Sequence, residues 1–192
     1  MHFLARVGWI AIAVLSASCC LSSLCLADEK EQVEVMEQLV VQAERLVKTA
    51  SEYADALADV KDAATADGAL ERLVKASDAF AIELDATLPI FDAAKKLAGA
   101  GRPKSSEYVP RFDAASRKFE TLEREGRTQD ARYARELLRI DNLEGLSSRF
   151  WDTFIIEIVR FNVSAGKFMA LLDGAAPREQ IQYFTDKLAL YE

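Results

Sequence analysis

Three arginines in this chain have the type and spacing to bind an anionic group. Arg132, Arg135 and Arg139 stand at positions i, i+3 and i+7, so they share one face of an α-helix. The planar guanidinium group offers a fork of donors that fits a carboxylate or a phosphate. The sequence predicts either a partner-binding site here or a solvated face, interleaved with acids and docked against the acidic residues 28–100.

One carboxylate could act as a lone acid catalyst. Lytic transglycosylases are exported helical enzymes that can work with a single glutamic acid, normally in an Ile-x-x-Glu-Ser setting followed by Gly-Leu-Met-Gln. The nearest stretch here runs from Ile140 to Ser147 and contains Glu144, but both the following serine and the Gly-Leu-Met-Gln turn are missing. A surface glutamate at a helix end explains Glu144 equally well, so a glycan-cleaving enzyme is the alternative prediction.

Aromatic side chains near the C-terminus form a third candidate site. Tyr183, Phe184 and Tyr191 lie on a predicted terminal helix, and Trp151 lies in the helix before it. Such side chains can anchor a partner or a second copy of the chain. The alternative is a terminal amphipathic helix that caps its own bundle.

Most metal, haem and nucleophilic chemistry is excluded by composition once a leader is removed. The only histidine is His2, and all three cysteines, Cys19, Cys20 and Cys25, lie in the first 27 residues. Zinc sites, His-ligated haem, Glu-x-x-His di-iron sites and Ser-His-Asp or Cys-His catalysis need these residue types. We therefore expect no metal and no cofactor in the mature chain.

The first 27 residues have the pattern of a signal peptide. Arg6 precedes a long apolar run, and Cys25 and Ala27 place small residues at the two positions that a signal peptidase reads. We expect cleavage after Ala27 and a secreted or periplasmic protein. Lipidation at Cys19 is the rival prediction, but that cysteine lacks the usual large aliphatic residue three places before it.

The mature chain, residues 28–192, is acidic. It has 23 basic and 31 acidic side chains, a net charge of −8, and residues 28–100 carry all of that excess. Such a chain is a poor candidate for nucleic acid or anionic lipid. Its length suits one domain with a sizeable core.

Two long helices are predicted directly after the cleavage site. Apolar residues follow helical spacing from Met36 to Val60 and again from Leu70 to Phe91. The first helix should run to about Ala64, Thr65 or Asp67 should cap the second, and Pro89 should kink it. The sequence thus predicts an antiparallel hairpin that ends near Pro103.

The turn of this hairpin resembles a known type. The stretch LADVKDAATADGALERLVKASDAF, from Leu57 to Phe80, resembles small exported bacterial helical proteins in which an L-x2-[VI]-K-D-x-A-[ST]-A turn joins two long helices. The resemblance covers roughly Tyr53 to Glu125. It implies a helical hairpin and export, and it carries no activity and no functional residues.

Four more helical segments follow in the pattern. A third helix should begin between Ser106 and Pro110 and close at Gly126, and Thr128 should cap a fourth piece that Gly145 ends. The next segment, Ser147 to Asp173, has two apolar faces and a narrow polar strip, which predicts a central helix packed on both sides. A short helix from Pro177 should end the chain. The polar strip comprises Thr153, Glu157, Arg160, Ser164 and Lys167. The apolar stripe of the last helix comprises Ile181, Phe184, Leu188 and Tyr191.

The predicted fold is all-α, an up-and-down bundle of four main helices with one or two short extras. Two functional classes fit it. The favoured one is an exported, non-enzymatic helical-bundle protein that binds another envelope protein or itself. The other is an enzyme that uses only carboxylates, lysine, serine or tyrosine.

Overall fold

The computed structural model describes residues 28–97 and 102–173, and this part of the chain is four helices without strands. They are α2 (Glu29–Asp59), α3 (Ala63–Leu97), α4 (Val109–Asp141) and α5 (Ser148–Asp173). The all-α, four-helix prediction is confirmed. The predicted leader and the predicted helix from Pro177 lie outside the described residues.

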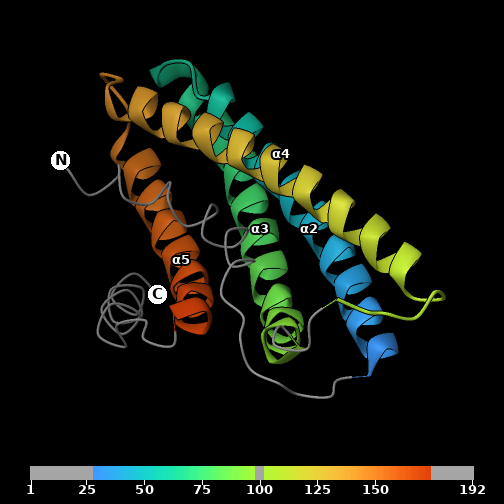
Figure 1. Cartoon of the computed structure of the whole chain (residues 1–192). Coiled ribbons are helices and arrows are strands. Elements are labelled where there is room, and N and C mark those ends of the chain that lie inside the picture. Colours follow the sequence, from blue (N-terminus) through green and yellow to red (C-terminus); the bar gives the residue numbers. More distant parts are fainter. Residues whose placement is uncertain (1–27, 98–101, 174–192) are drawn as a thin grey trace.

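The four helices pack as a row in the order α4, α2, α3, α5, with α4 lying along α2 and α5 beside α3 (Figure 1). Ion pairs give their directions. Glu37 pairs with Arg111 at 2.8 Å and Asp55 with Arg132 at 2.6 Å, so α2 and α4 run parallel. The short turn after Asp59 makes α3 antiparallel to α2. The chain therefore alternates up and down, as predicted.

The turn between α2 and α3 is built by reciprocal capping bonds. The Asp62 carboxylate accepts a hydrogen bond from the Thr65 backbone N–H at 2.9 Å, and the Thr65 hydroxyl accepts from the backbone N–H groups of Lys61 and Asp62. These bonds satisfy donors that the first turn of a helix leaves free. These bonds start α3 at Ala63. As a result α2 ends at Asp59, five residues before the predicted end at Ala64.

Gly68 lies inside α3, where the sequence predicted the turn. A Cβ atom added there would meet nothing within 4 Å. Glycine in a helix interior is less stable than alanine because it has more backbone freedom to lose on folding. We expect Gly68→Ala to raise the free energy of unfolding by about 0.5–1 kcal/mol. Urea unfolding checks this; a decrease would show that the first turns of α3 are not regular helix.

The predicted break at Gly126 is wrong. α4 is one continuous helix of 33 residues, and Gly126 and Thr128 lie within it. Its buried side continues through the glycine with helical spacings of three and four residues, so there is no reason for the chain to turn. The buried positions are Phe119, Leu122, Gly126, Asp130, Tyr133, Leu137 and Ile140. Ala131 lies outside this buried set and is exposed.

Among the described helices, α5, whose segment was predicted to be the central helix, lies at one end of the row. Within the described chain α5 packs mainly against α3, whereas α2 packs against both α3 and α4. α5 buries Phe150 and Phe154, as expected, but it also buries Glu157 and Ser164 from the polar strip. Ser77 and Asp78 of α3 lie beside Glu157 and Arg160, so the polar strip of α5 faces α3. The opposite side of α5 faces outward, and Ile155 there is 41% exposed.

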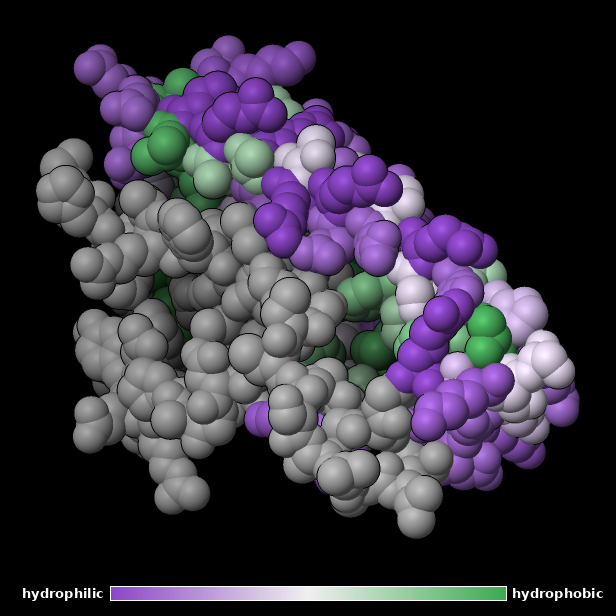
Figure 2. All heavy atoms as spheres, viewed as in Figure 1, coloured by the Kyte–Doolittle hydropathy of each residue, from purple (hydrophilic) through white to green (hydrophobic). Residues whose placement is uncertain are grey.

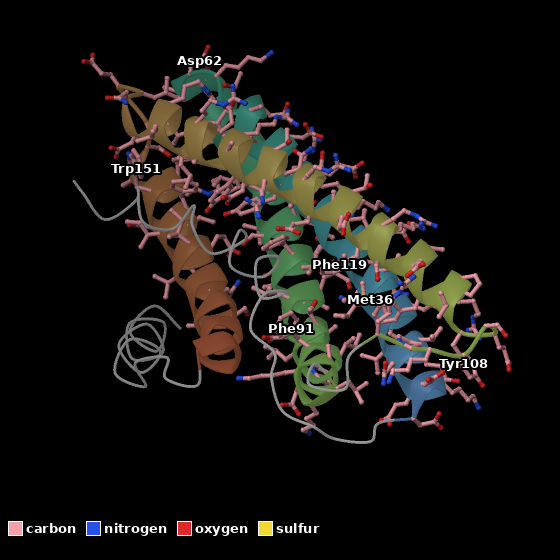
Figure 3. The ribbon with its side chains drawn as sticks, viewed as in Figure 1. Met36, Asp62, Phe91, Tyr108, Phe119 and Trp151 are labelled. Carbon is pink, nitrogen blue, oxygen red and sulfur yellow. The ribbon has the colours of Figure 1, made fainter. Side chains whose placement is uncertain are left out.

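One hydrophobic core joins all four helices. It includes Phe150 and Phe154 of α5, Phe91 of α3 and Phe119 of α4, and Met36 of α2 is partly buried against it; Figure 3 labels Met36, Phe91 and Phe119. At the α4–α5 turn, Gly145 has φ +77°, a conformation that L side chains rarely adopt. Among the described helices none is long and apolar enough to cross a membrane.

Candidate functional site

The inner side of α4 uses its cations to hold α2. Arg132 reaches Asp55, and Lys118 pairs with Glu44 at 2.5 Å. Arg139 donates to the backbone carbonyls of Val60 at 2.5 Å and Leu57 at 2.9 Å, and its Nε donates to Glu136 at 2.7 Å. The carbonyls at a helix C-terminus lack intrahelical partners, so Arg139 caps the end of α2. Two of the three arginines predicted as a partner site are therefore docked against the acidic hairpin.

Arg139→Ala should destabilise the fold because it removes a charged donor from the carbonyls of Leu57 and Val60 at the end of α2. Hydrogen bonds from a charged group contribute about 1.5–3 kcal/mol each, and Arg139 is only half-buried, so we expect a loss of about 1–3 kcal/mol. Arg135→Ala is the matched control and should change stability by no more than about 0.5 kcal/mol. Urea unfolding of both variants is the test, and equal effects would contradict the capping role.

The outer side of α4 carries arginines that no described carboxylate neutralises. Arg135 is exposed, and its Nε donates only to the carbonyl of Ala131 in its own helix. Arg117 and Arg124 lie on the same side of the helix as Arg135. Arg124 follows Arg117 by seven residues, and Arg135 follows Arg124 by eleven. None of the three has a carboxylate oxygen within 4 Å among the described residues, in contrast to the inner side. We call this surface the outer face of α4: Arg117, Arg124, Thr128, Arg135 and Leu138.

The outer face is open to solvent. Leu138 is half exposed, and its neighbours along this side are exposed as well. Figure 2 shows that the side of α4 turned toward the viewer is mostly hydrophilic. A row of exposed guanidinium groups with one apolar residue can bind carboxylate groups of another molecule.

A second candidate site is a buried polar cluster to which every described helix contributes. Its members are Tyr53 of α2, Ser77 of α3, Asp130 and Tyr133 of α4, and Glu157 of α5. The rings of Tyr53 and Tyr133 lie 5.3 Å apart at an angle of 40°. Tyr53 and Glu157 are each only 2% exposed. We call this group the tyrosine cluster.

Burial dominates the acid–base properties of the two tyrosines. It raises the pKa of Tyr53 to about 12, although hydrogen bonding with Ser77 and Tyr133 acts in the opposite direction. Burial also raises the pKa of Tyr133 well above its ordinary value, and the charge of Asp130 adds to that increase. A phenol surrounded by apolar atoms loses the hydration that stabilises its anion. Both hydroxyls are therefore protonated at neutral pH.

The two carboxyl groups of the cluster bind protons more tightly than exposed acids do. Burial raises the pKa of Asp130 to about 6. Burial also raises the pKa of Glu157, against the opposing effect of Arg160, whose guanidinium donates to Glu157 at 3.0 Å. Asp78 lies 3.7 Å from the same guanidinium and adds negative charge nearby. Asp130 thus takes up its proton near pH 6, above the range of an exposed aspartate.

The tyrosine cluster is poorly placed for catalysis on a large substrate. A general acid must come within hydrogen-bond reach of the bond that it protonates. Glu157 and Asp130 are enclosed by the helices, so an external polymer cannot approach them. The sequence analysis missed this cluster. Its signal was the periodicity of α4, which places Asp130 and Tyr133 on the buried side once the helix is read through Gly126.

The other predicted candidates are placed as follows. Glu144 is exposed in the turn between α4 and α5. Trp151 is half-buried near the start of α5 and meets Phe150 edge-on at 5.7 Å between ring centroids (Figure 3). Tyr183, Phe184 and Tyr191 lie outside the described residues.

Comparisons with known proteins add no assignment. No protein-family model matches this chain, and neither a curated protein nor a solved structure does. In the part of the chain that the structure describes, no group of three or more acidic, histidine or cysteine side chains could hold a metal ion.

Proposed function

We propose that this chain is an exported, non-enzymatic helical-bundle module of the cell envelope that binds another protein or itself. The observation that carries the proposal is the division of charge on α4. The inner side pairs Arg111, Lys118 and Arg132 with acids of α2, and Arg139 caps that helix. On the outer face, Arg117, Arg124 and Arg135 have no carboxylate oxygen within 4 Å among the described residues. Those groups are available to an acidic partner.

The test is binding to an envelope fraction by the purified mature chain and by Arg135→Glu. Losing one interfacial charge pair and gaining a repulsion should weaken binding about tenfold, which corresponds to about 1.4 kcal/mol. The binding should also weaken as salt rises, because exposed charges are screened. Arg132→Glu is unsuitable as a control, since Arg132 supports the fold. Glu71→Lys on α3 is exposed and serves instead.

The glycan-cleaving alternative keeps one accessible acid, Glu144. Incubation of the purified chain with peptidoglycan, followed by analysis of soluble fragments, separates the two functions. We expect no release by wild type or by Glu144→Gln. Release by wild type that is lost in Glu144→Gln would replace the binding proposal with an enzyme.

Export is part of the proposal, supported by the leader pattern of residues 1–27. The intact mass of the exported protein should place Asp28 at its N-terminus. In the structure Asp28 is the N-cap of α2, where its carboxylate accepts from the Lys30 backbone N–H at 3.0 Å. A diacylglyceryl mass on Cys19 would contradict cleavage after Ala27 and show a lipid anchor.

A further inference from the structure

The side of α5 that faces away from α3 is apolar and only partly covered. Helical spacing places Ile155, Val159 and Val163 on this side, opposite Phe150, Phe154 and Ile158. Their exposure is uneven. Ile155 is 41% exposed, Val163 is half-buried, and Val159 is only 8% exposed. Val159 is also absent from the core cluster that Phe150, Phe154 and Ile158 join.

We propose that residues 177–191 form an amphipathic helix that packs antiparallel on this outer side of α5. Three residues, Gly174 to Ala176, connect the end of α5 to this segment, which begins at Pro177. Short connections between helices give antiparallel neighbours, glycine suits the position after a helix, and proline suits the first turn of the next one. The segment's apolar stripe matches the apolar side that it would cover. The stripe comprises Ile181, Phe184, Leu188 and Tyr191.

The length of the segment agrees with where coverage ends on α5. Fifteen helical residues rise about 22 Å. An antiparallel segment of that length would lie alongside α5 from Asp173 back to about Val159. Leu188 would then lie near the level of Val163, and Tyr191 near the level of Val159. Ile155 lies about one further turn along and is beyond the reach of the segment. This accounts for an enclosed Val159 beside an exposed Ile155.

Disulfide trapping tests the contact in the full chain, with Cys19, Cys20 and Cys25 replaced by serine so that the engineered thiols are alone. Val163→Cys combined with Leu188→Cys should form an intramolecular disulfide under mild oxidation, seen as loss of thiol labelling in a monomer. Asp152→Cys with Leu188→Cys is the matched control: Asp152 is exposed on the same helix but too far along, so its thiols should remain free.

Two outcomes of the disulfide experiment overturn the proposal. A covalent dimer as the only product of the Val163–Leu188 pair would show that a second copy covers α5. Free thiols in that pair would show that the segment does not dock there. A second measurement serves if the double variant folds poorly. In Val163→Cys alone, a stop after Gly174 should speed thiol labelling by about tenfold, because the local cover is removed. An unchanged labelling rate contradicts docking.

Discussion

Replacing Phe154 with alanine should lower the free energy of unfolding by about 3–5 kcal/mol, the usual cost of deleting a large buried aromatic side chain. Phe154 is 1% exposed, stacks on Phe150 with ring centroids 5.3 Å apart, and joins the core between α5 and α3. Its removal leaves a cavity at the contact that attaches α5 to the other described helices. Urea unfolding of the purified mature variant measures the loss.

The neighbouring residues provide the controls for this prediction. Ile155→Ala should cost less than about 1 kcal/mol, because Ile155 is partly exposed, and Thr153→Ala should change stability by about 0.5 kcal/mol or less. Equal losses at Phe154 and Ile155 would mean that both sides of α5 are core. That result would restore the central-helix interpretation.

Asp130→Asn should stabilise the protein at pH 7 and leave it unchanged at pH 4. Burial raises the pKa of Asp130 from 3.8 to about 6, so the folded state binds the proton more tightly than the unfolded state. The free energy of unfolding contributed by this group is therefore highest below about pH 4 and falls as the pH rises to about 6. Two pKa units correspond to about 3 kcal/mol.

Asparagine keeps the shape of Asp130 without the charge, so the variant should exceed wild type by up to about 3 kcal/mol at pH 7. The other acids titrate equally in both proteins, so their effect cancels when the two are compared at the same pH. Asp62 is one of these acids, and hydrogen bonds from Thr65 lower its pKa. Glu125→Gln, an exposed acid of the same helix, should show no such difference. A variant less stable than wild type at pH 7 would mean that the Asp130 carboxylate gains more from its surroundings than it loses by burial.

The apolar seams of the sequence were enough to predict the fold class and most of the core. Leu39, Tyr53, Leu73 and Phe119 lie where helical spacing placed them, because burial of apolar surface is the dominant favourable term in folding. The break predicted at Gly126 failed because glycine was taken as a helix terminator. Glycine is tolerated inside a helix when the apolar pattern continues on both sides of it.

The tyrosine cluster was harder to predict because its carboxylates look like surface residues in a single helix, although Tyr53 already belongs to an apolar seam. Glu157 belongs to a polar strip in α5, and only contact with Ser77 on another helix makes that strip an interior one. For a similar reason, the sequence alone could not separate the three predicted arginines. Arg132, Arg135 and Arg139 are equivalent by spacing, and only the position of α2 separates the two docked residues from the exposed one.

The central claim, that the chain acts by binding through the outer face of α4, is tested most directly by site-specific photo-crosslinking in the intact envelope. A photoreactive amino acid replaces Arg117, Thr128 or Leu138, with Glu71 on α3 as the matched exposed control. We predict covalent adducts, to another protein or to a second copy, from the α4 positions and not from Glu71. Equal labelling at all four positions, or none at any of them, would contradict the claim.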